Sequence, residues 1–243
     1  MKKYFLLALC LLTLFASGCA RTYKAPVESV QNINVYSSYE GKIRGSFDII
    51  INLDPGLAIK DVKPSTFICG AHTFPVDIST ILRTSIYAAT EKIFEQINER
   101  TDIPSSEMML KEQKTGYIIV RLKEFEPVIT FMPGFFSGTA NASCESALEV
   151  EIRDHKNVKV YETAVSGNRS ASGDAGSMCG DGAKVMAEAV KKSFRETLER
   201  YAERLSNTEK LRKHFAAKVM QKAPAHFEPG LSRCQDTSLL LVN

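Results

Sequence analysis

The sequence predicts an α+β fold of the α/β-sandwich kind, with one mostly antiparallel sheet and two long amphipathic helices packed on one of its faces. Three observations lead to this expectation. Several short segments alternate apolar and polar residues, as half-buried strands do. Two long segments repeat apolar residues every three or four positions, as surface helices do. The order of these segments is strands, helix, strand, hairpin and helix.

The first strands and the first helix are predicted within residues 45–100. The segment GSFDIIINLD, residues 45–54, alternates and ends at an Asp-Pro-Gly turn, and residues 65–76 form a second β-prone segment. Asp77 can cap the helix that follows, which we expect to continue to about Arg100. Its buried face is predicted to contain residues in steps of three and four: Ile78, Leu82, Ile86, Ala89, Ile93 and Ile97.

A strand, a hairpin and a second long helix complete the predicted sandwich. Residues 115–125 alternate as a strand, and residues 146–154 and 158–165 form a hairpin around a polar turn. Segment 146–154 has one clean polar face, which suits a sheet covered on one side only. A Gly/Ser-rich loop is expected over residues 166–182. The helix after it carries the apolar stripe Met186, Val190, Phe194, Leu198, Tyr201 and Leu205.

The N-terminus has the features of an export signal over residues 1–18. Two lysines precede an apolar run that ends at small residues and is shorter than the roughly 20 residues of a membrane-spanning helix. The segment ASGC, residues 16–19, resembles the bacterial lipobox, although that pattern more often begins with Leu. The resemblance implies that Cys19 carries a lipid and, with Ala20 rather than Asp next, that the protein is sorted to the outer membrane. The alternative is ordinary signal-peptidase cleavage and a soluble periplasmic protein.

This signal divides the chain into four predicted parts. Residues 1–18 are the signal peptide, residues 19–31 a lipidated tether, residues 32–213 a single periplasmic domain and residues 214–243 a C-terminal tail. The chain has 31 Lys and Arg against 28 Asp and Glu, and two of the lysines lie in the signal. The mature chain is therefore nearly neutral, so its charge gives no reason to expect a nucleic acid as a partner.

Four of the six cysteines are available for disulfides, because one lies in the signal and Cys19 is the proposed lipid site. The four are Cys69, Cys144, Cys179 and Cys234. An even number in the oxidising periplasm predicts two disulfides, with three pairings open. We prefer Cys69–Cys144, which would join two predicted strands, and Cys179–Cys234, which would fix the tail to the loop before the last long helix.

The order of elements, together with the lipobox and the short tether, resembles the YajG-like family of small outer-membrane lipoproteins. It resembles more loosely the auxiliary lipoproteins of lipid-transport ABC systems and the lipoprotein domains of the curli-secretion type. The segment YETAVSGNRSASG, residues 161–173, carries most of this likeness, with a strand and small residues before the final helix. The four extra cysteines and the tail depart from it. The resemblance implies no enzyme activity and no cofactor, and an accessory or assembly role in the envelope.

The chain's residue patterns also give no basis for predicting a catalytic site or a metal site. Cys69 and His72 have the C-x-x-H spacing of half a zinc site, but no second pair with ligand spacing accompanies them. The segment around Ser137 lacks the G-x-S-x-G order of a nucleophile elbow. Glu124 and Glu126 fit the polar face of an exposed strand. We therefore expect a protein without enzymatic activity.

Four apolar residues surround Pro133-Gly134, where the chain should turn: Phe131, Met132, Phe135 and Phe136. Such residues either fold back onto the core or form an exposed patch for a membrane or a protein. We expect an accessory or assembly factor of an envelope or secretion complex, with the membrane and an envelope protein as partners and self-association left open. The alternative is an auxiliary transport component that binds a lipid or another apolar ligand between sheet and helices.

Overall fold

A computed structural model describes residues 20–134 and 138–222, with side chains up to residue 216. The main sheet has five strands in the order β4-β1-β5-β6-β7. They are β1 (Ile43–Asn52), β4 (Phe94–Glu99), β5 (Gly116–Met132), β6 (Thr139–Asp154) and β7 (Lys159–Asp174). The three longest strands, β5, β6 and β7, are antiparallel to one another, whereas β1 runs parallel to both β4 and β5. The predicted α+β class is confirmed, with a sheet that is mixed and has a large antiparallel part.

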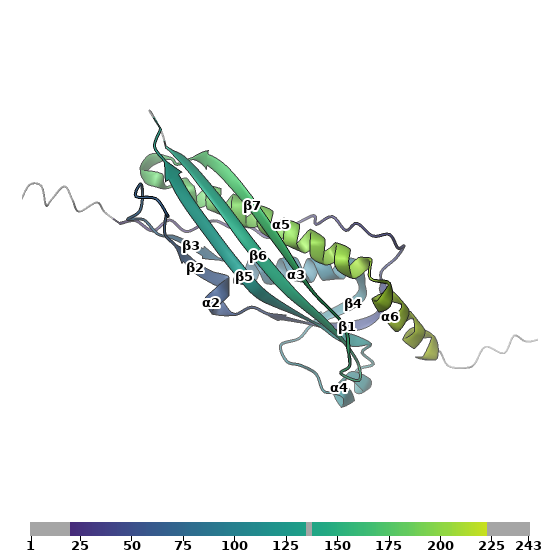
Figure 1. Cartoon of the computed structure of the whole chain (residues 1–243). Helices are drawn as coiled ribbons and strands as arrows, with labels where there is room; N and C mark the ends of the chain where they lie inside the picture. The colour runs from purple at the N-terminus through teal and green to yellow at the C-terminus, as the bar shows by residue number, and fades with distance from the viewer. Residues whose placement is uncertain (1–19, 135–137, 223–243) are drawn as a thin grey trace, which may run out of the picture.

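Two long helices, α3 (Ser79–Ile93) and α5 (Gly182–Ser206), cover one face of this sheet (Figure 1). Their apolar stripes are buried, and the hydroxyls of Thr90 and Tyr201 hydrogen-bond between them at 2.7 Å. A further helix, α6 (Glu209–Lys222), packs Phe215 edge-on against Phe47 of β1, with ring centroids 4.9 Å apart. The helix-covered face therefore holds the main core, as the periodicity predicted.

The sheet and α5 approach each other closely at Gly167 of β7. A Cβ atom on this residue would lie 2.5 Å from the carbonyl oxygen of Ser193, so only glycine fits. Beside it, the buried hydroxyl of Ser146 lies 2.8 Å from those of Ser193 and Thr197. These hydroxyls satisfy one another, which allows polar groups to lie in the middle of the core.

Among the described residues, the short helix α4 (Ser106–Lys111) and the residues that flank it cover one end of the second face of the sheet. Met109 packs there on Ile50, Tyr117 and Ile119. The buried carboxylate of Asp48 pairs nearby with Arg100 at 2.8 Å and with Lys114 at 2.6 Å. Further along, Arg121 and Lys123 of β5 form ion pairs with Glu149 and Glu151 of β6. Arg153 pairs with Glu151 within β6. This is the polar face predicted for segment 146–154.

The first predicted helix is shorter than its apolar spacing indicated. It ends at Ile93, and the next six residues form β4 instead of a further helical turn. Ile97 fits the helical spacing, but it pairs with Phe47 in the parallel ladder between β4 and β1. Local periodicity cannot show such a pairing, because its partner is far away in the sequence. The predicted cap is displaced by one residue: Ile78 is the N-cap, and Asp77 ends β3, although its carboxylate accepts the N–H of Ser79 at 3.0 Å.

The last strand is longer than predicted, because residues 166–174 continue β7 where a Gly/Ser-rich loop was expected. Their pairing with β6 reaches Asp174, which lies opposite Thr139. Gly and Ser have low intrinsic preference for strands, but a full-length neighbouring strand supplies hydrogen bonds that override it. The actual loop is short and contains one 3₁₀ turn, Ser177–Cys179.

Residues 20–33 lie along the domain, although most of them were expected to form a tether. Thr22 forms a parallel β-bridge with Thr73, and the N–H of Ala25 donates to the carbonyl of Pro75 at 2.9 Å. Val30 is buried, and its N–H donates to the buried hydroxyl of Ser85 at 3.0 Å. The folded unit therefore includes the chain from Thr22 onward. It is joined there to a small sheet of β2 (Ile59–Val62) and β3 (Phe74–Asp77), which follows the short helix α2 (Pro55–Ala58).

The helices of the described part of the chain are each too short or too polar to span a bilayer.

Candidate functional site

One end of the molecule brings together several of the residues that the sequence singled out. It is formed by the start of the described chain at residues 20–23, the loop 63–73, the end of β5 and the loop 174–180 (Figure 1). We call it the disulfide end, because Cys69 of the first loop and Cys179 of the second form a disulfide across it. The β6–β7 turn and α4 lie at the opposite end (Figure 1).

The pairing of the cysteines differs from the one we preferred. Cys69 is bonded to Cys179, with Cα atoms 6.2 Å apart, and not to Cys144. Cys144 is a free thiol buried on the helix-covered face of β6, whereas Cys69 lies in a loop at the end of the sheet. The preferred Cys179–Cys234 bond is thereby also excluded, and Cys234 itself lies outside the described residues. Burial raises the pKa of the Cys144 thiol to about 12, so this residue is an inert core side chain.

The first loop is fixed to the part of β5 that has no β1 beside it. The N–H of Ser65 donates to the carbonyl of Ile129 at 3.1 Å, and the N–H of Phe131 donates to the hydroxyl of Thr66 at 3.0 Å. The Thr66 hydroxyl also donates to the carbonyl of Ile68 at 3.3 Å. These bonds and the disulfide hold a loop without regular structure in one position against the sheet.

The second loop contains a run of left-handed backbone that shapes this end. Gly176 has φ +68°, and a Cβ atom there would collide with the carboxylate of Asp181. Met178 and Cys179 have φ of 51° and 67°, values that residues with a side chain adopt infrequently. Cys69 has φ 61° on the other side of the disulfide. The turn therefore places the sulfur of Cys179 toward the first loop while Met178 stays 59% exposed.

The predicted apolar tip is divided between the core and the surface. Phe131 is buried and packs on Phe74 with ring centroids 5.6 Å apart, so it is a core residue and not a contact for a partner. Its side chain points to the helix-covered face because strand residues alternate between faces. Met132, the next residue, points away and is 56% exposed. Phe135 and Phe136 lie outside the described residues.

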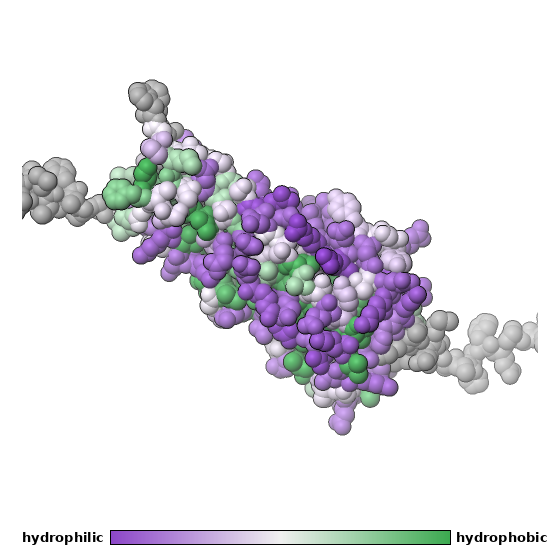
Figure 2. Space-filling view, in the orientation of Figure 1, coloured by the Kyte–Doolittle hydropathy of each residue, from purple (hydrophilic) through white to green (hydrophobic). Residues whose placement is uncertain are grey.

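Sequence reasoning missed three exposed apolar residues at this end. Phe67 is fully exposed, and Ile68 and Met178 are partly exposed beside the disulfide. Figure 2 shows hydrophobic residues gathered at the end where the described chain begins. The segment STFIC, residues 65–69, contains two of these apolar residues. We assigned it to a β-prone segment, and alternate apolar residues of a strand are normally buried.

The start of the described chain is packed into the same end. The Tyr23 ring lies against Phe74 and against the edge of His72, with centroid distances of 5.8 and 5.5 Å. The N–H of Tyr23 donates to the carbonyl of Thr73 at 2.9 Å. Cys19, the predicted lipid site, lies outside the described residues. Two residues lie between it and Thr22, and the three Cα–Cα steps of an extended chain reach at most about 11 Å.

The groups that resembled half a zinc site have other partners. Cys69 is bonded to Cys179, and Nδ1 of His72 accepts the N–H of Arg21 at 3.1 Å. Within residues 20–134 and 138–216, no three His, Cys, Asp or Glu side chains are grouped as a metal site requires. What this end offers instead is exposed apolar surface on a rigid support, an arrangement suited to contact with another apolar surface.

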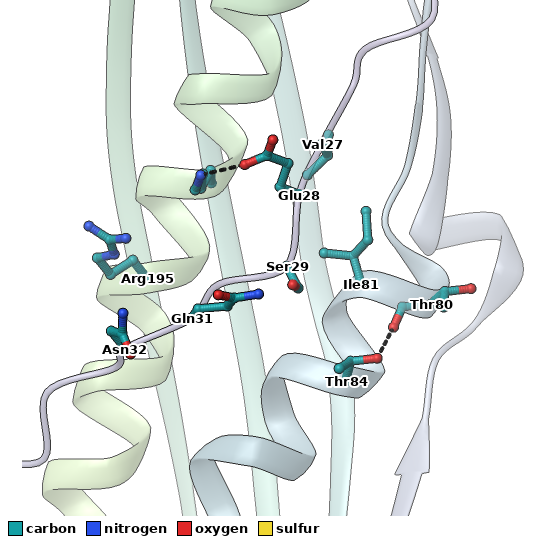
Figure 3. Close-up of a pocket in the computed structure, with 10 residues that line it drawn as sticks. Val27, Glu28, Ser29, Gln31, Asn32, Thr80, Ile81, Thr84 and Arg195 are labelled. Carbon is teal, nitrogen blue, oxygen red and sulfur yellow. Dashed lines mark hydrogen bonds and ion pairs between the residues drawn. The ribbon is translucent and has the colours of Figure 1, made fainter.

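A second feature is an open groove where the N-terminal segment crosses α3 and α5 (Figure 3). The groove has a volume of about 690 Å³ and is lined mainly by polar side chains. Glu28 pairs with Lys191 of α5 at 2.8 Å, and this hydrogen bond lowers the pKa of the Glu28 carboxyl. Arg195, Asn32 and Thr84 line it as well. Its contacts hold the N-terminal segment against the helices, which is a structural role.

Comparisons with known proteins identify no family for this chain: no protein-family model matches it, and no curated protein matches it. Among solved structures, a homologue of the neuraminyllactose-binding hemagglutinin from Helicobacter pylori is 8% identical, with a TM-score of 0.38, and the match covers 78% of this chain and 99% of that one. The protein CT253 from Chlamydia trachomatis is 12% identical, with a TM-score of 0.36 and coverage of 65% and 96%. A minor lipoprotein from Acinetobacter baumannii is 11% identical, with a TM-score of 0.27 and coverage of 72% and 92%. Values this low carry no argument about function, which is therefore built from this chain's own residues.

Proposed function

We propose that this protein is a lipoprotein anchored through Cys19 to the periplasmic face of the outer membrane. We propose further that it acts without enzymatic activity, as an accessory or assembly factor of an envelope complex. The sequence supports the anchor through the export signal and the lipobox-like ASGC. The observation that carries the proposal is the position of Thr22, which fixes the chain to the disulfide end only three residues after Cys19.

The mechanism follows from this short link. A long flexible tether would let the domain sample many distances and orientations above the membrane. A link with two residues between Cys19 and Thr22, about 11 Å at most, keeps the disulfide end near the lipid. The lipid would confine the domain to two dimensions and so raise its effective concentration toward other membrane-bound partners. The ion-pair ladder on the open face of β5 and β6 then stays accessible to an envelope protein.

The alternative function, binding of an apolar ligand between sheet and helices, has no observation in its favour. Apolar side chains of the sheet and of the helices fill the space between these two layers. Leu82, Ile86, Leu148 and Phe194 are all at most 3% exposed and belong to one continuous core cluster. An acyl chain would need that cluster to open, since ligand pockets are usually formed in advance.

Metabolic labelling tests the anchor. Cells that express the full chain are grown with labelled palmitate. Membrane and soluble fractions are then separated, and the protein and its label are measured in each. We expect label and membrane association in the wild-type protein and in the matched control Cys144→Ala, because the Cys144 thiol is buried. Cys19→Ala should lose both. Label that persists in Cys19→Ala would overturn the proposal.

A further inference from the structure

We propose that the disulfide end rests in the headgroup region of the membrane, with Phe67, Ile68, Met132 and Met178 as the contacting side chains. This inference rests on the proposed lipid anchor and goes beyond it. A lipid alone leaves open which surface of the domain faces the bilayer, whereas the inference fixes both the surface and the orientation.

The first support is the position of the four side chains. They come from the two loops and the end of β5, which the Cys69–Cys179 bond and the Thr66–Phe131 hydrogen bond hold side by side. Each is exposed, and Phe67 fully so. Large apolar residues that gather on one exposed end mark a contact site more often than scattered ones do. The apolar faces of interfacial amphipathic helices lie about 5–10 Å into the boundary between headgroups and acyl chains, and we expect these side chains to reach a similar depth.

The second support is where the described chain begins, which selects a membrane over a protein or a second copy of the chain. Thr22 is bridged to Thr73 at the disulfide end, so a lipid on Cys19 would enter the bilayer within about 11 Å of that bridge. The exposed apolar side chains lie on the same end. Their nearest large apolar partner is therefore the membrane that holds the lipid itself.

The third support is the charge around the patch. The carboxylates on either side of the second loop already have partners, since Asp174 accepts the N–H of Gly176 at 2.7 Å and Asp181 pairs with Lys184 at 2.6 Å. Arg21 and Lys63 are exposed next to the bridge and to the end of β2. Cations in this position favour anionic headgroups, and their long side chains reach the interface.

Single tryptophans test the orientation, because the chain contains none of its own. The full lipidated protein is reconstituted in vesicles of phosphatidylethanolamine and phosphatidylglycerol, with or without bromine on the acyl chains. Phe67→Trp and Met132→Trp report on the disulfide end. Val158→Trp is the matched control, because Val158 is 56% exposed at the opposite end of β6 and β7. The two ends are separated by the sixteen residues of β6, about 50 Å.

We expect brominated lipid to quench Phe67→Trp and Met132→Trp at least about twofold more than Val158→Trp, given the expected insertion depth. Equal quenching at both ends, in protein that still sediments with the vesicles, would overturn the orientation and leave the anchor intact. Failure to sediment would overturn both. Blue-shifted emission of Phe67→Trp without vesicles, rising with protein concentration, would overturn the inference in favour of a second copy on this surface.

Discussion

Thr22 and Thr73 form a β-bridge that fixes the chain to the folded domain three residues after Cys19. The bridge turns a segment expected to be a loose tether into part of the fold. It also determines which end of the domain a lipid on Cys19 would hold near the membrane. The same end carries the disulfide and the exposed apolar side chains. A lipid on Cys19 and the exposed apolar surface would therefore both place this end toward the membrane.

Docking of the N-terminal segment should depend on the hydroxyl of Ser85. This group accepts the N–H of the buried residue Val30 at 3.0 Å and donates to Ile81. Ser85→Ala leaves a buried N–H without its partner, which should lower the free energy of unfolding by about 1–3 kcal/mol. Urea unfolding of the Cys19→Ala protein provides the measurement.

Thr84→Ala, at the preceding position of α3, is the matched control. Thr84 is exposed and bonds only within its own helix, so its loss should change stability by no more than about 0.5 kcal/mol. Equal effects of the two substitutions would show that the Val30 contact adds nothing to stability.

The disulfide should stabilise the domain strongly, because Cys69 and Cys179 are 110 residues apart. Cross-linking so long a loop restricts the unfolded chain, and its removal typically costs about 2–5 kcal/mol. In a Cys234→Ser background, replacing both Cys69 and Cys179 by Ser should lower the urea midpoint accordingly. A reductant should lower the midpoint of the parent protein and leave that of the double variant unchanged. A reductant effect that survives in the double variant would mean that another disulfide is responsible.

The contact between α3 and α5 can be tested with a double-mutant cycle on Thr90 and Tyr201, whose hydroxyls bond at 2.7 Å inside the core. Thr90→Val leaves the buried Tyr201 hydroxyl unpaired and should cost about 1–3 kcal/mol. Adding Tyr201→Phe removes the stranded hydroxyl, so the double variant should be more stable than Thr90→Val alone. If the two losses simply add, the hydrogen bond does not couple the helices.

Stability should fall at alkaline pH because of Cys144. Its thiol ionises near pH 9 in the unfolded chain and only near pH 12 in the folded protein, because it is buried. Above pH 9 the unfolded chain therefore holds fewer protons than the native state. The contribution of this group is fully present below pH 9 and is lost as pH rises toward 12, at up to about 1.4 kcal/mol per pH unit.

The measurement is the free energy of unfolding between pH 9 and 10.5, with and without Cys144→Ala. Burial also raises the pKa of Tyr201, so a residual slope of the same sign should remain in the variant. Identical slopes in the two proteins would show that Cys144 ionises equally in the folded and unfolded states.

The spacing of apolar residues predicted a helix or strand correctly where the apolar side chains of that segment are buried in the folded domain. The stripe from Met186 to Leu205 became α5, and the alternation in residues 146–154 became the C-terminal half of β6. The apolar spacing gave the wrong prediction where pairing with a strand distant in the sequence determines the secondary structure. Ile97 fits a helix by spacing, but its pairing with Phe47 makes it part of β4. The Gly/Ser-rich residues 166–174 form a strand because β6 lies beside them.

The candidate site was predictable only in part, for the same reason. Composition restricts Cys69 to three partners but cannot choose among them, and the choice depends on which loops meet at the end of the sheet. Phe67 has no neighbour in the sequence that marks it as exposed. Its position follows from the bonds of Ser65 and Thr66 to β5, which hold the loop outside the core.

The lipid on Cys19 is the central claim, and the mass of one peptide tests it most directly. Trypsin cuts after Arg21, so mature lipoprotein extracted from membranes should yield the tripeptide Cys19-Ala20-Arg21. The account predicts that this tripeptide is the N-terminus and that its mass includes a diacylglyceryl group on the cysteine. A mature chain that begins at any other residue, or a Cys19 thiol without lipid, would contradict it.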